Sequence, residues 1–487
     1  MNILVLDVGT SSMRGLLMTH NGKELAKEQI FYRPCYKSGG IVEQSSEDWK
    51  NALYMIVKEI SKKAAEEGWK IEAISMTSQR SSVIPVDVHM KPLGNAVMWQ
   101  DKRANEICEI LQPENERIFS LCGSRLNPVF SAGKMAWIKK NQPKRYSDTY
   151  KFMVIPDFLN YLMTGNICTD YTYGSRSLLM NLGACRWDPV LLGLFGIEEK
   201  KLCPLVEPGS VCGVTSTEFS KITGCAEGIP VITAGGDQQC SAVGQGVIKR
   251  GILSVTVGTG GYLEAATEKI PENLRSDIVC NIASVKNQYI LESSVLTCCS
   301  AFDWFRKEFY ENVNYEQINK TLALVPPGSN GCLCLPYFQG RSTPDWNNKA
   351  KGMFANITLA TTKRDMLRSI LEGIAYEIAN GIESMKKYTE IVKVYVNGGL
   401  TESEVFNEIQ CNVYGTEIIR RGKADATARG ALMIAATTLG IYENVEEAFD
   451  EIGGKDKIKV YNPSPEIETV YAKCREEMNQ IYKKMWY

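Results

Sequence analysis

The chain opens with an aspartate in an apolar segment, followed by a short polar turn. Asp7 lies at the end of this segment, and Gly9, Thr10 and Ser11 follow it closely. A glycine-bearing turn between strands exposes backbone N–H groups and hydroxyls that can hold phosphate oxygens. The carboxylate can hold Mg²⁺, and Arg14 on the returning strand can pair with a phosphate. Taken alone, these residues also fit an ordinary hairpin with a polar tip.

A second turn of the same kind lies about half a chain away. Gly258, Thr259 and Gly260 separate two strand-like segments, 253–257 and 261–266. The turn resembles the start of a dinucleotide-binding fingerprint, but a strand follows it rather than a helix, and a Walker-type phosphate loop is absent. Two facing hairpins can hold one phosphate chain from both sides. The pair therefore predicts a nucleotide site between two related halves of the chain.

Polar side chains also follow three other strand-like segments. Asp237 and Gln238 come after two glycines and begin a helix, where the simpler alternative is an N-cap aspartate. Gln79 and Arg80 follow a second segment, and Asp101 follows a third, where solvated loops are the alternative. Such a density of hydrogen-bonding groups at strand ends suits a polyhydroxylated ligand.

Two glycines end a further strand-like segment in the second half. Gly398 and Gly399 come directly after this segment, and a helix follows near Ser403. Glycines let a ligand approach the backbone closely. We therefore expect a planar adenine or a phosphate to approach here.

An alternation of strands and helices positions these residues in both halves. A helix is expected over about 46–67 before a strand at 71–77, and the capping-box pattern from Thr362 to Asp365 begins another helix. Such alternation favours α/β layers. Because 487 residues exceed one ordinary hydrophobic core, we predict two domains, 1–247 and 248–487.

The composition excludes several classes of function. The net charge of -1 gives no reason to expect nucleic acid or an anionic membrane as a partner. The start does not resemble a signal peptide, and no apolar run reaches the roughly 20 residues of a membrane helix. The 16 cysteines include no Cys-x-x-Cys, and two histidines leave little room for metal sites or triads built on histidine. We expect a cytoplasmic protein with free thiols; a homodimer stays an open alternative to a monomer.

Together these segments resemble the FGGY family of carbohydrate kinases, which has the two ribonuclease H-like domains of the sugar kinase and actin ATPase superfamily. Both hairpins resemble the family's phosphate hairpins, and the segment 236–239 resembles the one that carries the catalytic aspartate. The segments 130–138 and 352–372 resemble the two family signatures, with Val129 and Asn356 as departures. The resemblance implies an α/β fold with ATP and Mg²⁺ in a cleft between two domains.

The resemblance also assigns roles to individual residues. Asp237 is the expected catalytic residue: a free aspartate, with a pKa of about 3.9, cannot deprotonate an alcohol outright, so it positions the hydroxyl and takes the proton during phosphoryl transfer. The expected nucleotide-binding residues are Asp7, Gly9, Thr10, Ser11, Arg14, Gly258, Thr259, Gly260, Gly398, Gly399 and Ser403, with Mg²⁺ at Asp7. The expected substrate-binding residues are Gln79, Arg80, Asp101, Asp237 and Gln238.

The substrate is left open between a short-chain polyol and a ketopentose such as xylulose. Local similarity is greatest to glycerol kinases, but Ser81 and Val129 stand where those enzymes carry a glutamate and a tyrosine. Xylulose kinases carry Gln-Met-His-Gly where this chain has residues 79–82. Because polar recognition in a buried pocket is specific, we expect weak activity on glycerol. The alternatives are a glycerol kinase proper and a catalytically silent sugar sensor or scaffold.

Overall fold

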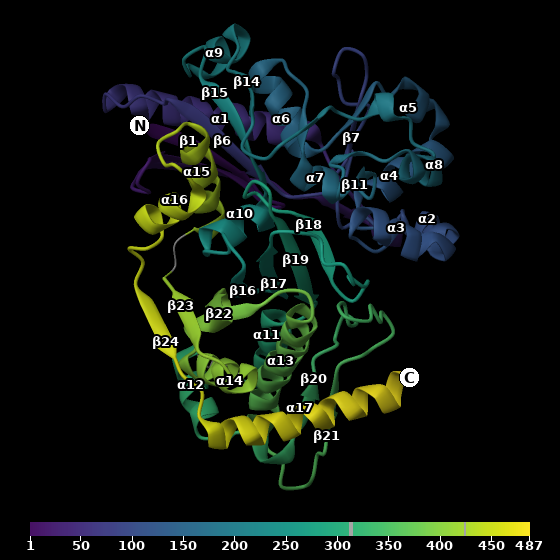
Figure 1. Cartoon of the computed structure of the whole chain (residues 1–487), viewed down its shortest axis with the longest axis vertical. Coiled ribbons are helices and arrows are strands. Elements are labelled where there is room, and N and C mark those ends of the chain that lie inside the picture. Colours follow the sequence, from purple (N-terminus) through teal and green to yellow (C-terminus); the bar gives the residue numbers. More distant parts are fainter. Residues whose placement is uncertain (311–314, 423–424) are drawn as a thin grey trace.

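Two β-sheets with helices packed on their faces form the framework of the protein (Figure 1). The computed structural model describes residues 1–310, 315–422 and 425–487. The first sheet has the order β14-β15-β6-β1-β2-β3. Its strands are β1 (Asn2–Val8), β2 (Ser12–Thr19), β3 (Glu24–Phe31), β6 (Ala73–Ser78), β14 (Val211–Val214) and β15 (Pro230–Gly236).

The second sheet has the order β18-β19-β17-β16-β22-β23-β24. Its strands are β16 (Gly251–Val257), β17 (Gly261–Thr267), β18 (Val279–Ile282), β19 (Tyr289–Val295), β22 (Ile391–Asn397), β23 (Ile418–Arg421) and β24 (Ile458–Tyr461). Short strands outside the two sheets are β4 (Cys35–Lys37), β5 (Ile41–Gln44), β7 (Ile84–Val86), β8 (Ala96–Val97), β9 (Lys151–Met153), β10 (Thr169–Asp170), β11 (Met180–Asn181), β12 (Arg186–Trp187), β13 (Leu205–Val206), β20 (Leu333–Leu335) and β21 (Met353–Ala355).

The two sheets repeat one topology. In the first, β3, β2 and β1 are antiparallel neighbours, and β6 and β15 then run parallel to β1. In the second, β19, β17 and β16 are antiparallel, and β22 and β23 run parallel to β16. The two predicted hairpins, β1–β2 and β16–β17, are therefore equivalent elements of two similar halves.

Helices cover both sheets. In the first half they are α1 (Ser46–Glu66), α2 (Asn105–Leu111), α3 (Asn115–Cys122), α4 (Ser131–Asn141), α5 (Pro143–Asp148), α6 (Ile155–Thr164), α7 (Tyr171–Ser175), α8 (Pro189–Phe195), α9 (Thr217–Thr223) and α10 (Asp237–Gly244). In the second half they are α11 (Cys299–Phe309), α12 (Tyr315–Ala323), α13 (Lys363–Lys386), α14 (Glu404–Tyr414), α15 (Ala426–Thr438), α16 (Val445–Ile452) and α17 (Pro465–Trp486). The predicted capping box is present: Asp365 N–H donates to the Thr362 side chain at the start of α13.

Helix α10 lies between the two sheets and joins their cores (Figure 1). Cys240 and Val243 pack in the cluster that contains Ile3 of the first sheet. Ala242 packs in another cluster with Ile252 of the second sheet. Because α10 follows β15 directly and begins at Asp237, this packing fixes the helix that carries the predicted catalytic residue.

Helices α15 and α16 belong to the second half of the sequence but pack on the first sheet (Figure 1). Ala431 lies in one cluster with Ile3, and its carbonyl accepts a hydrogen bond from Ser75 Oγ at 2.8 Å. Helices α10 and α15 approach closely because both carry glycine at the contact: a Cβ on Gly430 would lie 1.8 Å from the Cys240 carbonyl oxygen. The domain division at residue 247 stays a prediction.

The cysteines and the apolarity of the helices bear on the expectations from composition. All 16 cysteines are free thiols, as expected from the sequence. Within residues 1–310, 315–422 and 425–487, no helix combines the length and apolarity that a membrane crossing requires.

Candidate active site between the two sheets

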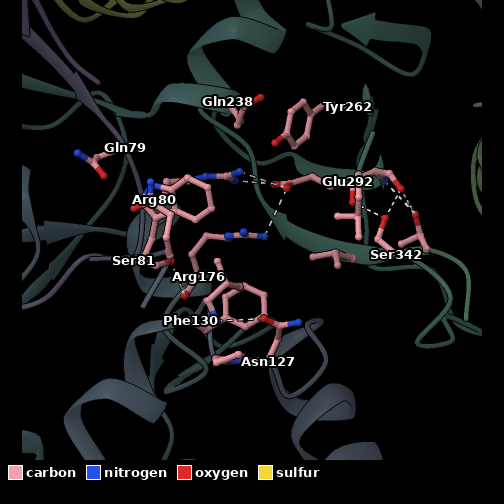
Figure 2. A pocket seen from close by; sticks show the side chains of 18 of the residues that line it. Gln79, Arg80, Ser81, Asn127, Phe130, Arg176, Gln238, Tyr262, Glu292 and Ser342 are labelled. Carbon is pink, nitrogen blue, oxygen red and sulfur yellow. Dashed lines mark hydrogen bonds and ion pairs between the residues drawn. The ribbon is translucent and has the colours of Figure 1, made fainter. Parts of the chain in front are cut away.

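A cavity of about 530 Å³ lies where the loops that follow strands of the first sheet face strands β17 and β19 of the second sheet (Figure 2). From the first half it is lined by six of the residues predicted from the sequence, namely Thr10, Gln79, Arg80, Asp101, Asp237 and Gln238. From the second half it is lined by residues of β17 and β19, among them Tyr262, Glu264 and Glu292. Its volume is in the range of pockets that bind small molecules.

A network of charged side chains crosses the cavity. Arg80, which follows β6, donates to Glu292 Oε1 of β19 at 2.8 Å, and its Nε lies 3.6 Å from Asp237 Oδ1. Arg176 Nη1 lies 3.4 Å from the other Glu292 oxygen, and Asn281 donates to Glu292 at 2.9 Å. Figure 2 shows both guanidinium groups pointing to this carboxylate.

The network sets the ionisation of its carboxylates. Burial opposes the charge of Glu292, but Arg80 and Arg176 outweigh it and lower the pKa of Glu292 to about 2. Burial raises the pKa of Asp237 above its usual value, with Arg80 opposing the shift. Glu292 is thus a fixed anion, whereas Asp237 is shifted toward the range of a proton acceptor.

Arg176 lies at the side of the cavity opposite Gln238. Its guanidinium carbon is 4.6 Å from the centre of the Phe130 ring, a cation–π distance. Ser81 Oγ donates to the Arg176 carbonyl at 3.3 Å, and the backbone of Ser81 is left-handed with φ of 72°. The short Ser81 side chain and Val129 both line the cavity, so neither fills it with a large polar group.

A buried lysine holds the loop that carries Val129. Lys134 of α4 is 1% exposed, and its ammonium group donates to the carbonyl oxygens of Pro128, Val129 and Phe130 at 2.8, 2.6 and 3.1 Å. Burial lowers the pKa of Lys134 to about 7. All three acceptor residues line the cavity, so this lysine fixes one of its walls.

The first hairpin meets the cavity at its tip. Thr10 Oγ1 accepts a hydrogen bond from the indole N–H of Trp99 at 3.1 Å, and the Gly9 carbonyl accepts from Gln79 Nε2 at 3.0 Å. Ser11 is exposed at the turn. The turn predicted to hold phosphate is therefore anchored to two loops that also line the cavity.

Asp7 and Arg14 form a charged pair on this hairpin. The Arg14 guanidinium contacts both Asp7 and Asp425, the N-cap of α15. Burial raises the pKa of Asp7 to about 6; Arg14 opposes the shift, whereas the charges of Asp425 and Asp237 add to it. The two contacts leave other N–H groups of the Arg14 guanidinium for the predicted phosphate contact.

The second hairpin and the glycine pair lie together beyond the cavity lining. The Gly258 N–H donates to the Gly260 carbonyl at 2.9 Å, and the Thr259 carbonyl accepts from Cys298 N–H at 2.8 Å. Gly398 has φ of 97°, and a Cβ there would lie 2.4 Å from the Val257 carbonyl oxygen. Only glycine therefore lets the end of β22 pack against this hairpin.

Gly399, Ser403 and Asp101 have structural roles within the protein. Gly399 begins a short 3₁₀ helix (Gly399–Glu402), and Ser403 is the N-cap of α14 and donates to Asn319 at 2.5 Å. The Asp101 carboxylate, which is 1% exposed, accepts from Val42 N–H at 2.7 Å and from Arg103 at 2.9 Å. Asp101 lines the cavity with both oxygens already bonded, so its expected contact with substrate stays a prediction.

Sequence reasoning missed the charged residues on the far side of the cavity: Arg176, Glu264 and Glu292 were not predicted. Glu264 and Glu292 lie inside β17 and β19, and each is an ionisable residue within an otherwise apolar or small-residue strand. A buried charge in such a strand is unusual unless it has a function or a partner. That signal was present in the sequence.

Comparison with known proteins identifies the kind of enzyme. The N-terminal domain of the FGGY family of carbohydrate kinases matches residues 2–244, and the C-terminal domain of that family matches residues 253–439. The duplicated sheets and the polar cavity are therefore those of a phosphotransferase with an alcohol acceptor. The chain belongs to the FGGY family of carbohydrate kinases, which use ATP.

Named relatives include two kinds of kinase. The chain is 31% identical to a glycerol kinase of Thermococcus gammatolerans over 96% of this chain and 94% of that protein. It is 26% identical to a xylulose kinase of Bacillus subtilis over 92% of this chain and 90% of that protein. The crystal structure of a xylulose kinase from Lactobacillus acidophilus superposes with a TM-score of 0.92 at 25% identity and covers 99% of this chain and 98% of that one.

Proposed function

We propose that this enzyme transfers the γ-phosphate of ATP to a terminal hydroxyl of a neutral polyol or ketose larger than glycerol. The observation that carries the proposal is the cavity of about 530 Å³, in which Asp237 and Arg80 lie together with Ser81 and Val129. The small side chains of Ser81 and Val129 leave room beside the catalytic carboxylate. A three-carbon substrate would leave much of the polar wall without a partner, which weakens its binding.

Asp237 is the proposed catalytic residue. Its carboxylate begins α10 at the end of β15 and lines the cavity, where a substrate hydroxyl can reach it. Burial raises its pKa, so it accepts a proton more readily than a free aspartate does. In this proposal Arg80 and Gln238 hold further substrate hydroxyls, and Asp237 takes the proton as the phosphoryl group transfers.

The residues of the first hairpin fit Mg²⁺. Burial is the main cause that raises the pKa of Asp7, and the charges of Asp425 and Asp237 add to it. A cation beside these carboxylates would favour their charged forms. Among the described residues no group of three or more His, Cys, Asp or Glu side chains is arranged to hold a metal ion by itself. One or two carboxylates suffice, since Mg²⁺ is commonly held by these together with substrate phosphates. When bound, Mg²⁺ neutralises phosphate charge.

The two hairpins are the proposed phosphate clamp. Thr10 and Ser11 would contact the phosphates from the first half, with Thr259 and its flanking glycines opposite them. Gly398, Gly399 and Ser403 would lie nearer the adenosine. The equivalence of β1–β2 and β16–β17 in the two sheets supports this arrangement.

A coupled ATPase assay with a panel of acceptors tests the proposal. The panel contains glycerol, C4 and C5 polyols, and ketoses including xylulose, and product formation is confirmed by mass spectrometry. We expect the highest kcat/KM for a four- or five-carbon acceptor. Glycerol as the best acceptor would favour the second candidate, a glycerol kinase, which Arg80, Asp237 and Gln238 also fit. ATP-independent binding of sugars with no turnover would contradict both.

A further inference from the structure

Glu264 is a buried carboxyl group in the cavity wall that has no role in the chemistry described above. It lies on β17, is 2% exposed and lines the cavity. Within residues 1–310, 315–422 and 425–487, no hydrogen bond or ion pair engages its side chain. Because Glu264 lines the cavity, its carboxyl group is within reach of a bound acceptor.

The neighbouring carboxylate, that of Glu292, binds the arginine side chains on this side of the cavity. Glu264 is the direct cross-strand partner of Glu292 on β19. Glu292 holds Arg80, Arg176 and Asn281, while Glu264 is left without a donor. Burial and the charge of Glu292 hold the pKa of Glu264 well above its usual value, although Arg80 partly opposes them.

The carboxyl group of Glu264 presents acceptor oxygens to the cavity. A carboxyl group accepts hydrogen bonds whether or not it carries a proton, so Glu264 can bind a hydroxyl of the acceptor. A carboxyl group does not attract an anionic substrate, and the two guanidinium groups nearest to it, those of Arg80 and Arg176, already face the Glu292 carboxylate. The wall of β17 and β19 therefore suits an uncharged, oxygen-rich chain.

We propose that Glu264 is a specificity-determining residue, whose carboxyl group accepts a hydrogen bond from a hydroxyl of the acceptor. This inference rests on the proposed function and narrows its substrate class: an uncharged ketose or polyol that reaches from Asp237 to the β17–β19 wall, rather than a sugar acid or sugar phosphate. A substrate hydroxyl would thereby supply the partner that Glu264 lacks among the described residues.

The experiment compares Glu264→Leu and Glu264→Gln with the parent on its best acceptor from the panel. Loss of a buried hydrogen bond predicts a rise of about 10- to 100-fold in the acceptor KM for Glu264→Leu, with an unchanged KM for ATP. Glu264→Gln keeps a donor and an acceptor, so its KM stays within about fivefold. Glu268→Leu, an exposed position after the same strand, is the control and should match the parent.

Two further measurements distinguish a direct effect of Glu264 on acceptor binding from an effect on the stability of the protein. A deoxy acceptor that lacks the contacted hydroxyl should have the same KM as the complete acceptor when the enzyme is Glu264→Leu. The substitution and the missing hydroxyl remove the same hydrogen bond, so their effects on KM do not add. The melting temperature of Glu264→Leu should stay close to that of the parent, because the substitution removes no hydrogen bond or ion pair within the protein. If Glu264→Leu does not fold, the KM values of Glu264→Gln for the complete acceptor and for deoxy acceptors provide the test instead.

The outcomes distinguish the inference from the proposed function. A parent that phosphorylates nothing in the panel contradicts the proposed function. An active parent whose acceptor KM is unchanged in Glu264→Leu overturns only the role of Glu264. A parent that prefers an aldonic acid or a sugar phosphate to the neutral acceptor of equal length also overturns it.

Discussion

The guanidinium group of Arg80 and the carboxylate of Glu292 are 2.8 Å apart and join the two sheets across the cavity. Their positions lie 212 residues apart in the chain, and both side chains are largely buried. The same carboxylate also faces Arg176. Substrate therefore binds beside a charged contact that links the two halves of the enzyme.

Glu292→Gln is expected to destabilise the protein and to weaken acceptor binding. The change leaves two buried guanidinium groups without their anion, and breaking such a pair costs about 3–5 kcal/mol. Chemical denaturation gives the loss in the free energy of unfolding, and steady-state kinetics gives the acceptor KM. Glu28→Gln on β3, outside the cavity, is the control. A variant as stable as the parent would show that the arginines need no shared anion.

Asp237→Asn is expected to abolish phosphoryl transfer while ATP binding stays nearly intact. The amide keeps the size of the side chain and an acceptor for the Gln238 N–H, which now donates to Asp237 at 2.9 Å. Removing a positioned base lowers the rate by about 10²–10⁴-fold. Single-turnover kinetics and calorimetric titration with ATP measure the two effects. If a folded variant turns over within a few-fold of the parent, Asp237 is only a helix N-terminal residue, and Asp101 is the next to test.

Gly398→Ala is expected to weaken ATP binding more than acceptor binding. A methyl group there meets the Val257 carbonyl and must displace the second hairpin. Gly415→Ala is the matched control, because Gly415 also has a positive φ, of 60°, but its Cβ would meet only the Glu468 side chain at 3.7 Å. Both variants carry backbone strain, but only Gly398→Ala displaces the second hairpin. Only Gly398→Ala should therefore lose affinity for ATP. Equal ATP affinity in the two variants would show that Gly398 does not contribute to the nucleotide site.

Lys134→Met is expected to alter both the acceptor KM and the pH dependence of stability. The variant leaves three carbonyl groups of the 128–130 loop without their donor. The pKa of Lys134 is about 7 in the folded protein and about 10.4 in an unfolded chain. Between these values the unfolded chain binds the extra proton, so the contribution of Lys134 to stability increases as pH rises from 7 toward 10.

Denaturation of parent and variant across this pH range measures the Lys134 effect. Asp101, Cys108 and Arg176 are the other titratable groups whose charge acts on Lys134, and all three are retained in the variant. The difference in unfolding free energy between parent and variant should widen with pH. A difference that is constant with pH would show that Lys134 keeps its proton throughout.

The local elements were predictable because they depend on neighbouring residues. The hairpins around Gly9 and Gly258 and the helix that begins after Thr362 were each predicted from a short pattern, and the structure has them. The cavity contacts of Glu292 were not predictable in this way. They join strands from different sheets, and side-chain periodicity specifies which face of a strand is buried but not which distant residue meets it.

The return of α15 and α16 to the first sheet has a consequence for synthesis of the chain. Ile3 and Ile232 are covered in part by helices encoded near the end of the polypeptide. While the ribosome is still translating the second half, that apolar face lacks the part of its cover that α15 and α16 provide. The first half therefore completes its core only after residue 426 and those that follow have been synthesised, and a fragment that ends before residue 426 would expose apolar surface and tend to aggregate.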